Sequence, residues 1–534
     1  MTIRTFLTCV LVLALATLAL RAQQTGVDII LTNGKIITVD DRFTIAQAIA
    51  IRGDRIVAVG ANPDISRLAN ESTRRIDLRG RAVIPGLIDN HMHLLRAGAT
   101  WQSEVRLDGV ASRKDALDRL RARAKAIAPG EWISTLGGWT IEQFADDSRP
   151  FTRAELDAAV PANPLLLQAS YYKTYLNSRA LQVLGIDNNT TGVIEEANVR
   201  QVAARVPVAT GDRLETSTRS MISDLNQAGL TTFGSAGCET EVLPLYRKLA
   251  DQRQLNVRVF CITGAAAANP QQVDQVVAQI PQMRLFQGSA FIDHVFYGES
   301  VYGPLHDPMF IPASDPKPDQ LAQWRRIASE IAKAGLPLHV HANLTNTIDA
   351  FLDQIEAVHK EHPITNLRWT LAHVNQINAR HLDRMKRLGM YAAVHPWAVI
   401  NGGINRTVFG EAAIDMPPLK TIQDSGIMWG FGSDGSRANQ ILPFTTLAWA
   451  VTGRMVGGAK VLTQTISRED ALIAHTRRNA FFVFQENNLG SIQPGKLADL
   501  IVLDRDYLTV PPEQIKDIHS VLTMVGGRVV FEAK

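Results

Sequence analysis

Net charge is nearly absent from this chain of 534 residues, in which 55 Lys and Arg face 52 Asp and Glu. The formal net charge of +3 falls to +1 if residues 1–22 are removed, because that segment holds Arg4, Arg21 and no acid. So small an excess excludes a general attraction to nucleic acid or to acidic surfaces. We expect a small-molecule substrate and no nucleic-acid partner.

Long hydrophobic runs are missing after residue 22, where no stretch of about 18 uncharged apolar residues occurs. The run from Phe6 to Leu20 is shorter than a typical membrane span of about 20 residues. Arg4 precedes it, and Ala22 offers a small residue for cleavage, which is typical of a secretory signal. We predict a signal peptide at residues 1–22, a secreted or periplasmic protein, and no stable membrane insertion after cleavage. An uncleaved N-terminal anchor is the alternative.

Cysteine is scarce, with three residues in the whole chain. Cys9 lies within the predicted signal, so at most one disulfide can form in the mature protein, between Cys238 and Cys261. An oxidising compartment would permit that bridge. Two cysteines near separate predicted strands are more often buried thiols, and buried thiols are our prediction.

The two ends of the chain share a β character, and no fixed-period repeat is visible between them. Short alternating segments with turn residues between them predict antiparallel strands at both ends. We expect one small β-sandwich built from residues 23–81 and 488–534. Its candidate strands are Asp28–Leu31, Lys35–Val39, Ala48–Ile51, Arg55–Val59, Ala498–Leu503 and Val521–Phe531.

Between the ends, apolar runs alternate with helical patterns, which is typical of an α/β fold with a parallel sheet. Eight such units predict a TIM-type (β/α)8 barrel over residues 82–487, with its chemistry at the carboxyl ends of the strands. Residues of about 100–221 exceed the eight units and are expected to form an α/β insertion after the first strand, over the barrel mouth. The candidate barrel strands are Ala82–Asp89, Leu230–Gly234, Val257–Ile262, Ala290–Phe296, Leu336–Val340, Arg368–Leu371, Tyr391–Val394 and Met428–Gly432, and those of the insertion are Trp132–Leu136 and Pro164–Ala169.

Histidines stand at the ends of several predicted strands. The first strand ends in Asp89, His91 and His93, which share one face because they alternate along extended chain. Two imidazoles on one face can bind a common metal ion, with Asp89 placed to orient one of them. His341 and His373 end the fifth and sixth strands. With only 13 histidines in the chain, this placement predicts a metal site.

An aspartate, Asp434, ends the eighth strand. Its place with the histidines at the strand ends makes Asp434 part of the expected metal site. Arg437 follows it, either to pair with a substrate carboxylate or to cap the next helix, and the sequence leaves both open.

Two motifs resemble those of the amidohydrolase superfamily. The segment Val83–His93 is similar to its first-strand signature, and Gly490–Asp504 is similar to its return to the β-sandwich. The long insertion, with Leu176–Leu181, resembles the family 3 branch, which includes N-substituted formamide deformylases. The resemblance implies that His91 and His93 bind one metal and that His341 and His373 bind a second, more exposed one. It also implies that Asp434 contacts the metal and is the catalytic proton shuttle. A carboxylate beside a metal-activated water can take its proton and pass it to a leaving amine.

The fourth strand departs from that family, in which a carboxylated lysine usually bridges two metals. Lysine is absent from Phe291–Glu299. Counting back from Gly298 puts Asp293 in the lysine's place, and we expect Asp293 to be a ligand. His294 and Glu299 are the alternatives, and one or two ions per chain remain open. Imidazole and carboxylate ligands favour zinc, with manganese, iron and cobalt as alternatives.

The sequence as a whole predicts an exported metal-dependent amidohydrolase that cleaves a C–N bond, in an amide or cyclic amide, with metal-activated hydroxide. An enzyme with the same site that acts on an ester or lactone, or as an isomerase, is the first alternative. A barrel that binds a ligand without catalysis is the second. Residues that flank the expected ligands also differ from the family, so the substrate does not follow from the resemblance.

Overall fold

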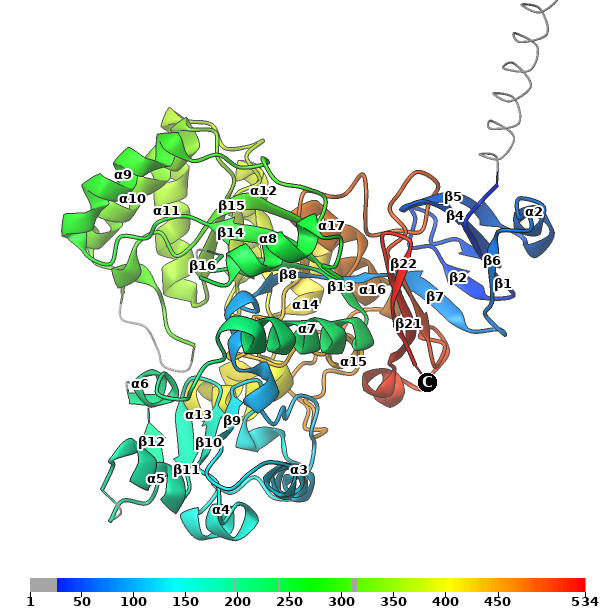
Figure 1. Ribbon diagram of the computed structural model, residues 1–534. Coiled ribbons are helices and arrows are strands. Elements are labelled where there is room, and N and C mark those ends of the chain that lie inside the picture. The colour runs from blue at the N-terminus through cyan, green and yellow to red at the C-terminus, as the bar shows by residue number, and fades with distance from the viewer. Residues whose placement is uncertain (1–25, 188, 196–197, 239–240, 310–314, 534) are drawn as a thin grey trace, which may run out of the picture.

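The computed structural model describes residues 26–533 except 188, 196–197, 239–240 and 310–314. The predicted signal peptide therefore lies outside the described residues. Within them, eight parallel strands form one sheet in the order β19-β18-β17-β16-β15-β14-β13-β8 (Figure 1). These strands are β8 (Leu87–Met92), β13 (Leu230–Ala236), β14 (Arg258–Thr263), β15 (Ile292–Glu299), β16 (Leu338–Ala342), β17 (Thr370–His373), β18 (Tyr391–Val394) and β19 (Trp429–Phe431).

The first and last strands of this sheet close it into a barrel. The backbone N–H of Asp434, just after β19, donates to the carbonyl of His91 at 2.9 Å, and that of His93 donates to the carbonyl of Gly435. The side-chain amide of Asn479 adds a hydrogen bond to a carbonyl of each of the two strands. The predicted barrel is thus confirmed, and every predicted barrel strand overlaps an observed one.

Amphipathic helices surround the barrel (Figure 1). In α10 the buried residues include Trp324, Ile327 and Ile331, whose spacing of three and four places them on one face. Trp324 stacks on Phe351 of the neighbouring α11, with ring centroids 4.6 Å apart. The helices are α7 (Gly211–Gln227), α8 (Leu243–Asp251), α9 (Val273–Gln279), α10 (Pro318–Lys333), α11 (Thr345–Glu361), α12 (Ala379–Leu388), α13 (Ala398–Phe409), α14 (Leu419–Asp424), α15 (Pro443–Thr452), α16 (Arg468–Ala474) and α17 (Arg477–Phe482).

The two chain ends meet in a small β domain beside the barrel (Figure 1). One sheet has the order β5-β4-β1-β6, and the other, β22-β21-β20-β7-β2-β3, joins strands from both ends. Apolar side chains of both sheets, such as Ile49 and Leu500, share one core, so the predicted sandwich is confirmed. The strands are β1 (Ile29–Thr32), β2 (Lys35–Ile37), β3 (Ile45–Ala46), β4 (Ala48–Arg52), β5 (Arg55–Gly60), β6 (Arg74–Asp77), β7 (Ala82–Pro85), β20 (Leu500–Leu503), β21 (Ser520–Val525) and β22 (Arg528–Glu532), with α2 (Asn62–Ser66) after β5.

The first predicted barrel strand, Ala82–Asp89, is divided between the two domains. Its first half is β7, which pairs with β20 of the small domain, and its second half begins β8 of the barrel. The break falls at Gly86, where an added Cβ would lie 2.2 Å from the hydroxyl of Thr231. A glycine therefore lets the chain pass closely over β13 between the domains.

A buried ion pair also ties the small domain to the barrel. Arg258 of β14 donates from Nε and Nη2 to the two oxygens of Asp499, at 2.8 and 2.9 Å. Their side chains are 1% and 3% exposed. The backbone N–H of Gly526 donates to the same carboxylate at 2.7 Å. Both oxygens of this buried carboxylate are thereby satisfied.

The segment between β8 and α7 forms the predicted insertion, with its own sheet in the order β12-β11-β10-β9. It contacts the segments that follow the last barrel strands: Thr140 Oγ1 donates to the carbonyl of Ile400 in α13, and Ser170 Oγ donates to that of Ala438 after β19. Its elements are α3 (Arg113–Ala126), β9 (Ile133–Leu136), α4 (Arg153–Ala159), β10 (Leu165–Ala169), β11 (Lys173–Leu176), α5 (Ser178–Leu184), β12 (Val193–Glu195) and α6 (Val199–Ala203).

Cys238 and Cys261 form a disulfide, so the prediction of two buried thiols is wrong. Cys261 lies within β14 beside Ser235 of the adjacent strand β13, and Cys238 follows β13 directly. This pairing of neighbouring strands brings the two Cα atoms to 5.6 Å, a usual distance for a disulfide.

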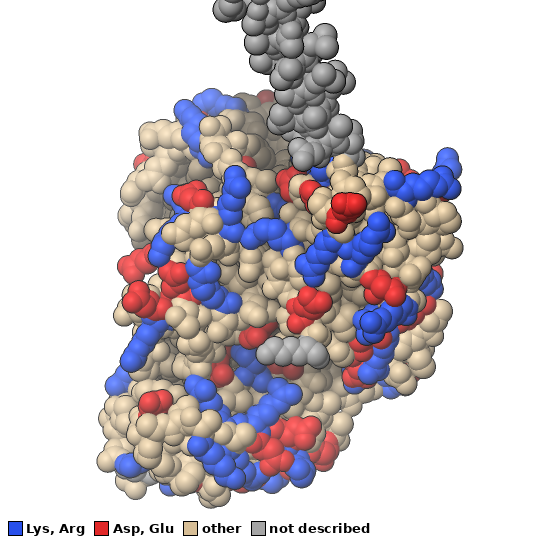
Figure 2. Space-filling model, turned by 45° about the vertical axis from the view of Figure 1, so that its right-hand side comes forward, with Lys and Arg blue, Asp and Glu red and all other residues tan. Residues whose placement is uncertain are grey.

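No helix in the described part of the chain is both long enough and apolar enough to cross a membrane. Basic and acidic side chains are interspersed over the face shown in Figure 2, on the barrel and the small domain alike. This distribution agrees with the small net charge of the sequence.

Candidate active site

The mouth of the barrel gathers most of the predicted site residues. His91 and His93 lie at the end of β8, with His91 fully buried and His93 partly exposed. Asp89 does not orient either ring as expected, because its carboxylate accepts the backbone N–H groups of His91 and Ser433, each at 3.0 Å. Burial raises the pKa of Asp89 to about 7. This residue therefore holds the ends of β8 and β19 together.

Glu299, the last residue of β15, lies at the centre of the site. Its Oε2 is 3.5 Å from Nε2 of His91 and 3.4 Å from Nε2 of His93. Its Oε1 is 3.2 Å from Nδ1 of His341 and 2.9 Å from Nε2 of His373. Burial alone would raise the pKa of Glu299, but the charge of His91 and hydrogen bonds from the histidines hold it well below its usual value. Each carboxylate oxygen thus faces a different pair of histidines.

Asp293 does not join this group, and its prediction as a ligand is corrected to Glu299. The Asp293 carboxylate accepts the backbone N–H groups of Gly288 and His294, each at 2.8 Å, near the start of β15. Asp293 lies six positions before Glu299 along the extended strand, which is a path of roughly 20 Å. His294, the alternative that neighbours Asp293, lies on the outer side of the barrel, where its Nε2 is 3.3 Å from Nη2 of Arg247. The strand continues to residue 299 instead of ending at 296, and this moves its carboxyl end to the glutamate.

Asp434 lies against the first pair of histidines, as the sequence predicts. Its Oδ1 is 3.1 Å from Nε2 of His93 and 3.8 Å from Nε2 of His91. Its Oδ2 accepts a hydrogen bond from the indole N–H of Trp397 at 3.0 Å. Burial opposes ionisation, yet the hydrogen bond with His93 and the neighbouring histidines hold the pKa of Asp434 below its usual value. One oxygen is therefore fixed by Trp397 while the other faces the site.

The donor atoms are close enough together to hold divalent ions. One ligand atom from each of His91, His93 and Glu299 lies within 4.8 Å of the others, and the same is true of Glu299, His341 and His373. Nε2 of His91 is buried and makes no hydrogen bond among the described residues. Imidazole nitrogens and a shared carboxylate suit zinc and related ions. The residues therefore fit two adjacent metal positions that share Glu299.

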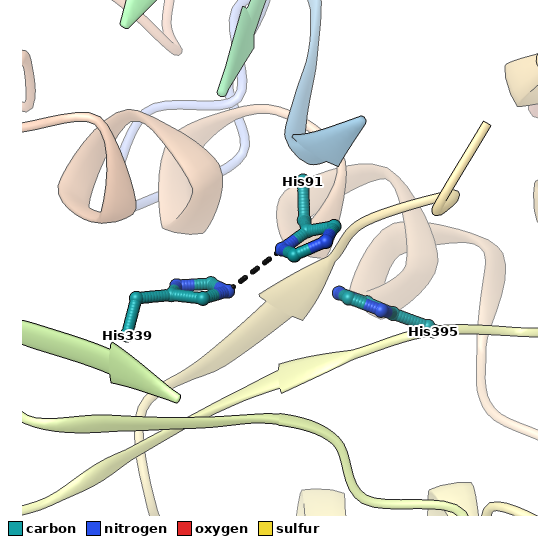
Figure 3. A group of neighbouring side chains, drawn as sticks. All are labelled: His91, His339 and His395. Carbon is teal, nitrogen blue, oxygen red and sulfur yellow. Dashed lines mark hydrogen bonds between the residues drawn. The ribbon is translucent and has the colours of Figure 1, made fainter. Parts of the chain in front are cut away.

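Two further histidines lie beneath these ligands in the barrel. Figure 3 shows the rings of His91, His339 and His395 converging, with a hydrogen bond of 2.9 Å between Nδ1 of His91 and Nε2 of His339. Nδ1 of His395 similarly contacts Nδ1 of His373. Burial and the adjacent histidines hold the pKa of both His339 and His395 well below its usual value, so both are neutral. Each orients a ring that faces Glu299.

Asp307 orients His341 from the opposite side. Its Oδ1 lies 2.7 Å from Nε2 of His341. Its Oδ2 accepts the backbone N–H groups of Asn343 and Leu344, at 3.0 and 2.8 Å. Sequence reasoning missed Asp307, which lies in an irregular loop after β15. It also missed the roles of His339 and His395, although His339 shares a strand face with His341 at a spacing of two.

The site opens into a cavity of about 710 Å³ between the barrel and the insertion. The insertion contributes polar and aromatic side chains to it, and the barrel loops contribute an apolar wall. The lining residues from the insertion are Tyr171, Tyr172, Lys173, Glu195 and Arg200, and the apolar ones from the barrel loops are Pro308, Met309, Trp397, Ile404 and Val408. This volume is of the size that takes a small molecule.

Known proteins are similar to this chain in sequence and in fold. An N-substituted formamide deformylase of Arthrobacter pascens is 26% identical over 545 aligned positions, which cover 95% of this chain and 98% of the relative. An uncharacterized metal-dependent hydrolase from Pyrococcus furiosus superposes with a TM-score of 0.63 at 21% identity, covering 90% of this chain and all of that one. An atrazine chlorohydrolase from Arthrobacter aurescens, complexed with zinc, has a TM-score of 0.53 at 18% identity, covering 94% and 95% of the two chains.

The family match extends over the barrel, the insertion and the part of the small β domain from residue 74 onward. The amidohydrolase family matches residues 74–531, which is most of the chain and includes every residue of the candidate site. Together with the barrel and the histidines at its mouth, this match shows that the chain belongs to the amidohydrolase family.

Proposed function

We propose that the protein is a metal-dependent hydrolase that cleaves the C–N bond of an amide or cyclic amide. The observation that carries this proposal is the position of Glu299, whose two oxygens face His91 and His93 on one side and His341 and His373 on the other. Membership of the amidohydrolase family and the similarity to a relative named N-substituted formamide deformylase support the C–N bond as the target.

Glu299 and the four histidines would hold two divalent ions, most suitably zinc. When bound, such ions lower the pKa of water towards neutrality and polarise a carbonyl group. The protein contributes the geometry: Glu299 fixes the separation of the two positions, and His339, His395 and Asp307 fix the rings of the ligands.

Asp434 would move the proton of the reaction. Its Oδ1 faces His93 at 3.1 Å and the cavity, while Trp397 holds its other oxygen. A carboxylate in this position can accept a proton from the attacking water and pass it to the amine that leaves. The amine then departs in its neutral form instead of as an unstable anion.

We also propose that the protein is exported. Its first 22 residues have the composition of a secretory signal. The Cys238–Cys261 disulfide supports the same location, because structural disulfides persist in oxidising compartments. The N-terminal sequence of protein recovered from the periplasm or the medium tests this proposal, with Gln23 expected as the first residue and an intact N-terminus contradicting it.

The hydrolase proposal is tested by metal analysis together with a substrate panel. Freshly purified protein should contain close to two divalent ions per chain, and the variant His91→Asn/His93→Asn should lose at least one. The panel pairs N-formyl amines, N-acyl amines and cyclic amides with the matching esters and lactones. Hydrolysis of the esters or lactones alone would overturn the assignment to C–N bonds, and a metal-free wild-type protein would overturn the metal site.

A further inference from the structure

Arg437 places a positive charge in the active-site cavity without a carboxylate partner. It lies three residues after Asp434, is half-buried and lines the same cavity. Within the described residues it forms no ion pair with an Asp or Glu side chain. Burial and the nearby Arg96 lower its pKa, although an arginine keeps its charge near neutral pH. A partly desolvated cation of this kind is costly unless an anion joins it.

The acidic residues that line the cavity in the described part of the chain already have partners. Glu195 pairs with Lys173 at 3.0 Å. Glu104, which lies towards Arg437, pairs with Arg106 at 2.8 Å. The remaining acids of the cavity wall face histidines of the metal site, and these are Glu299, Asp307 and Asp434. Away from the candidate metal site, the cavity wall therefore carries more positive than negative side chains, with Arg96, Lys173, Arg200 and Arg437 against Glu195 alone.

Two more arginines extend this positive wall to the rim of the cavity. Arg96 donates from Nη2 to the hydroxyl of Tyr171 at 3.1 Å. The guanidinium of Arg200 lies over the ring of the same tyrosine, 4.5 Å from its centroid. Both line the cavity and neither forms an ion pair with a described carboxylate. Tyr171 thus contacts both arginines at the cavity wall, and Tyr171 and Arg96 lie near Arg437.

The backbone of Arg437 is fixed by the insertion. The N–H of Gly138 donates to the carbonyl of Arg437 at 3.1 Å. A Cβ added at Gly137, where φ is +83°, would lie 2.2 Å from that same carbonyl oxygen. Only a glycine turn can approach this closely, so the position from which the Arg437 side chain extends is well defined.

The structure also decides whether Arg437 caps the helix that follows it or is free to pair with a substrate carboxylate. Helix α15 begins at Pro443, six residues after Arg437, with Leu442 as its N-cap. A helix N-terminus needs a hydrogen-bond acceptor, whereas a guanidinium has only donors. Arg437 therefore does not cap this helix, and a ligand is the remaining partner for its charge.

We propose that the substrate is an amide that carries a carboxylate, which binds Arg437 with Arg96 beside it while the scissile bond lies between Glu299 and Asp434. This inference rests on the proposed hydrolase function. A guanidinium fork matches the two oxygens of a carboxylate. The apolar wall formed by Met309, Ile404 and Val408 accommodates a hydrocarbon remainder. An N-acylated amino acid has this combination of an amide, a carboxylate and an apolar part.

The test compares N-acyl amino acids with the matching N-acyl amino acid amides, which have the same shape but no charge. Wild-type protein should prefer the carboxylates. In Arg437→Gln, kcat/KM for the carboxylates should fall roughly 100-fold, as is typical when one member of a desolvated charge pair is removed. For the neutral amides it should change less than about 3-fold. Arg437→Lys should retain part of the preference, because it keeps the charge but not the fork.

Arg387→Gln is the matched control, since it removes the same charge from the outer face of α12. Metal content and thermal midpoint should be unchanged in all three variants, which separates a loss of recognition from a loss of folding. Equal turnover of charged and neutral substrates by wild-type protein, with Arg437→Gln unaffected, would overturn the carboxylate while leaving the hydrolase function intact.

Calorimetry with 3-phenylpropionate, its carboxamide and 2-phenylethylphosphonate tests the same inference without turnover. The carboxylate should bind wild-type protein at least 10-fold more tightly than the carboxamide, and Arg437→Gln should abolish the difference. If the protein showed this binding preference but hydrolysed no amide, the proposed hydrolase function would be refuted and the carboxylate site would stand. Tighter binding of the phosphonate than of the carboxylate would overturn the choice of carboxylate.

Discussion

The carboxylate of Asp307 lies 2.7 Å from Nε2 of His341, on the opposite edge of the ring from Glu299. It is itself held by two backbone N–H groups, so the ring of His341 is fixed with Nδ1 facing the site. Carboxylates placed in this way orient a ligating histidine and increase its basicity. Asp307 belongs to an irregular loop, yet it determines the direction of a residue on strand β16.

We predict that Asp307→Asn weakens metal binding at the second position about 10- to 100-fold, because an uncharged amide increases the basicity of the His341 ring less than a carboxylate does. Competition with a chelator of known affinity measures this change. Asp383→Asn, on the exposed face of α12, removes a carboxylate away from the site and should have no effect. Unchanged metal affinity in Asp307→Asn would show that the backbone alone positions His341.

Glu299→Gln should release one or both ions and reduce activity by about 10³-fold or more, because each oxygen of the Glu299 carboxylate faces a different pair of histidines. Asp293→Asn is the matched variant on the same strand. It should retain full metal content and activity within about 2-fold, since the hydrogen bonds of Asp293 among the described residues are to nearby backbone N–H groups, away from the candidate site. Metal analysis and kcat distinguish the two variants. If Asp293→Asn lost metal and activity while Glu299→Gln kept both, Asp293 would be the ligand.

Asp434→Asn should retain most of its metal and lose about 10²- to 10⁴-fold in kcat, because an amide cannot accept the proton of the attacking water. The side chain keeps its size, and its oxygen can still accept the hydrogen bond from Trp397. Steady-state kinetics and metal analysis on the same preparation check both parts. Full activity would refute the role of Asp434 as proton shuttle.

Removal of metal with a chelator should abolish activity and lower the thermal midpoint, because ions that bind only the folded protein stabilise it by mass action. Addition of zinc, cobalt or manganese to the dialysed protein should restore both properties, and the ion that restores the most activity identifies the best cofactor. Activity that survives exhaustive chelation, confirmed by metal analysis, would contradict a metal-dependent reaction.

Arg258→Met should destabilise the protein by about 3–5 kcal/mol, since Asp499 would remain buried without its partner at the junction of the two domains. The double variant Arg258→Met/Asp499→Leu should recover a substantial part of this loss, because it leaves no isolated charge. Denaturant unfolding measures both. A single variant as stable as wild type would show that water enters the junction and replaces the pair.

The sequence by itself determined the barrel and most residues of the candidate metal site, because both depend on local patterns. Apolar runs that alternate with helical patterns located all eight strands, and an alternation of two placed His91 and His93 on one face. The ends of the strands carry the chemistry in a barrel, so His341, His373 and Asp434 could be selected before their contacts were known.

Tertiary structure decided the features that depend on how far a strand extends and what lies beside it. The choice of Glu299 over Asp293 required the register of β15 against β16, which no local periodicity specifies. The disulfide required the pairing of β13 with β14, and the role of Asp307 required the path of an irregular loop. The position of Arg437 in a cavity between the barrel and the insertion, unpaired among the described residues, also came from the tertiary structure, because the burial and pairing of charges depend on segments distant in the chain.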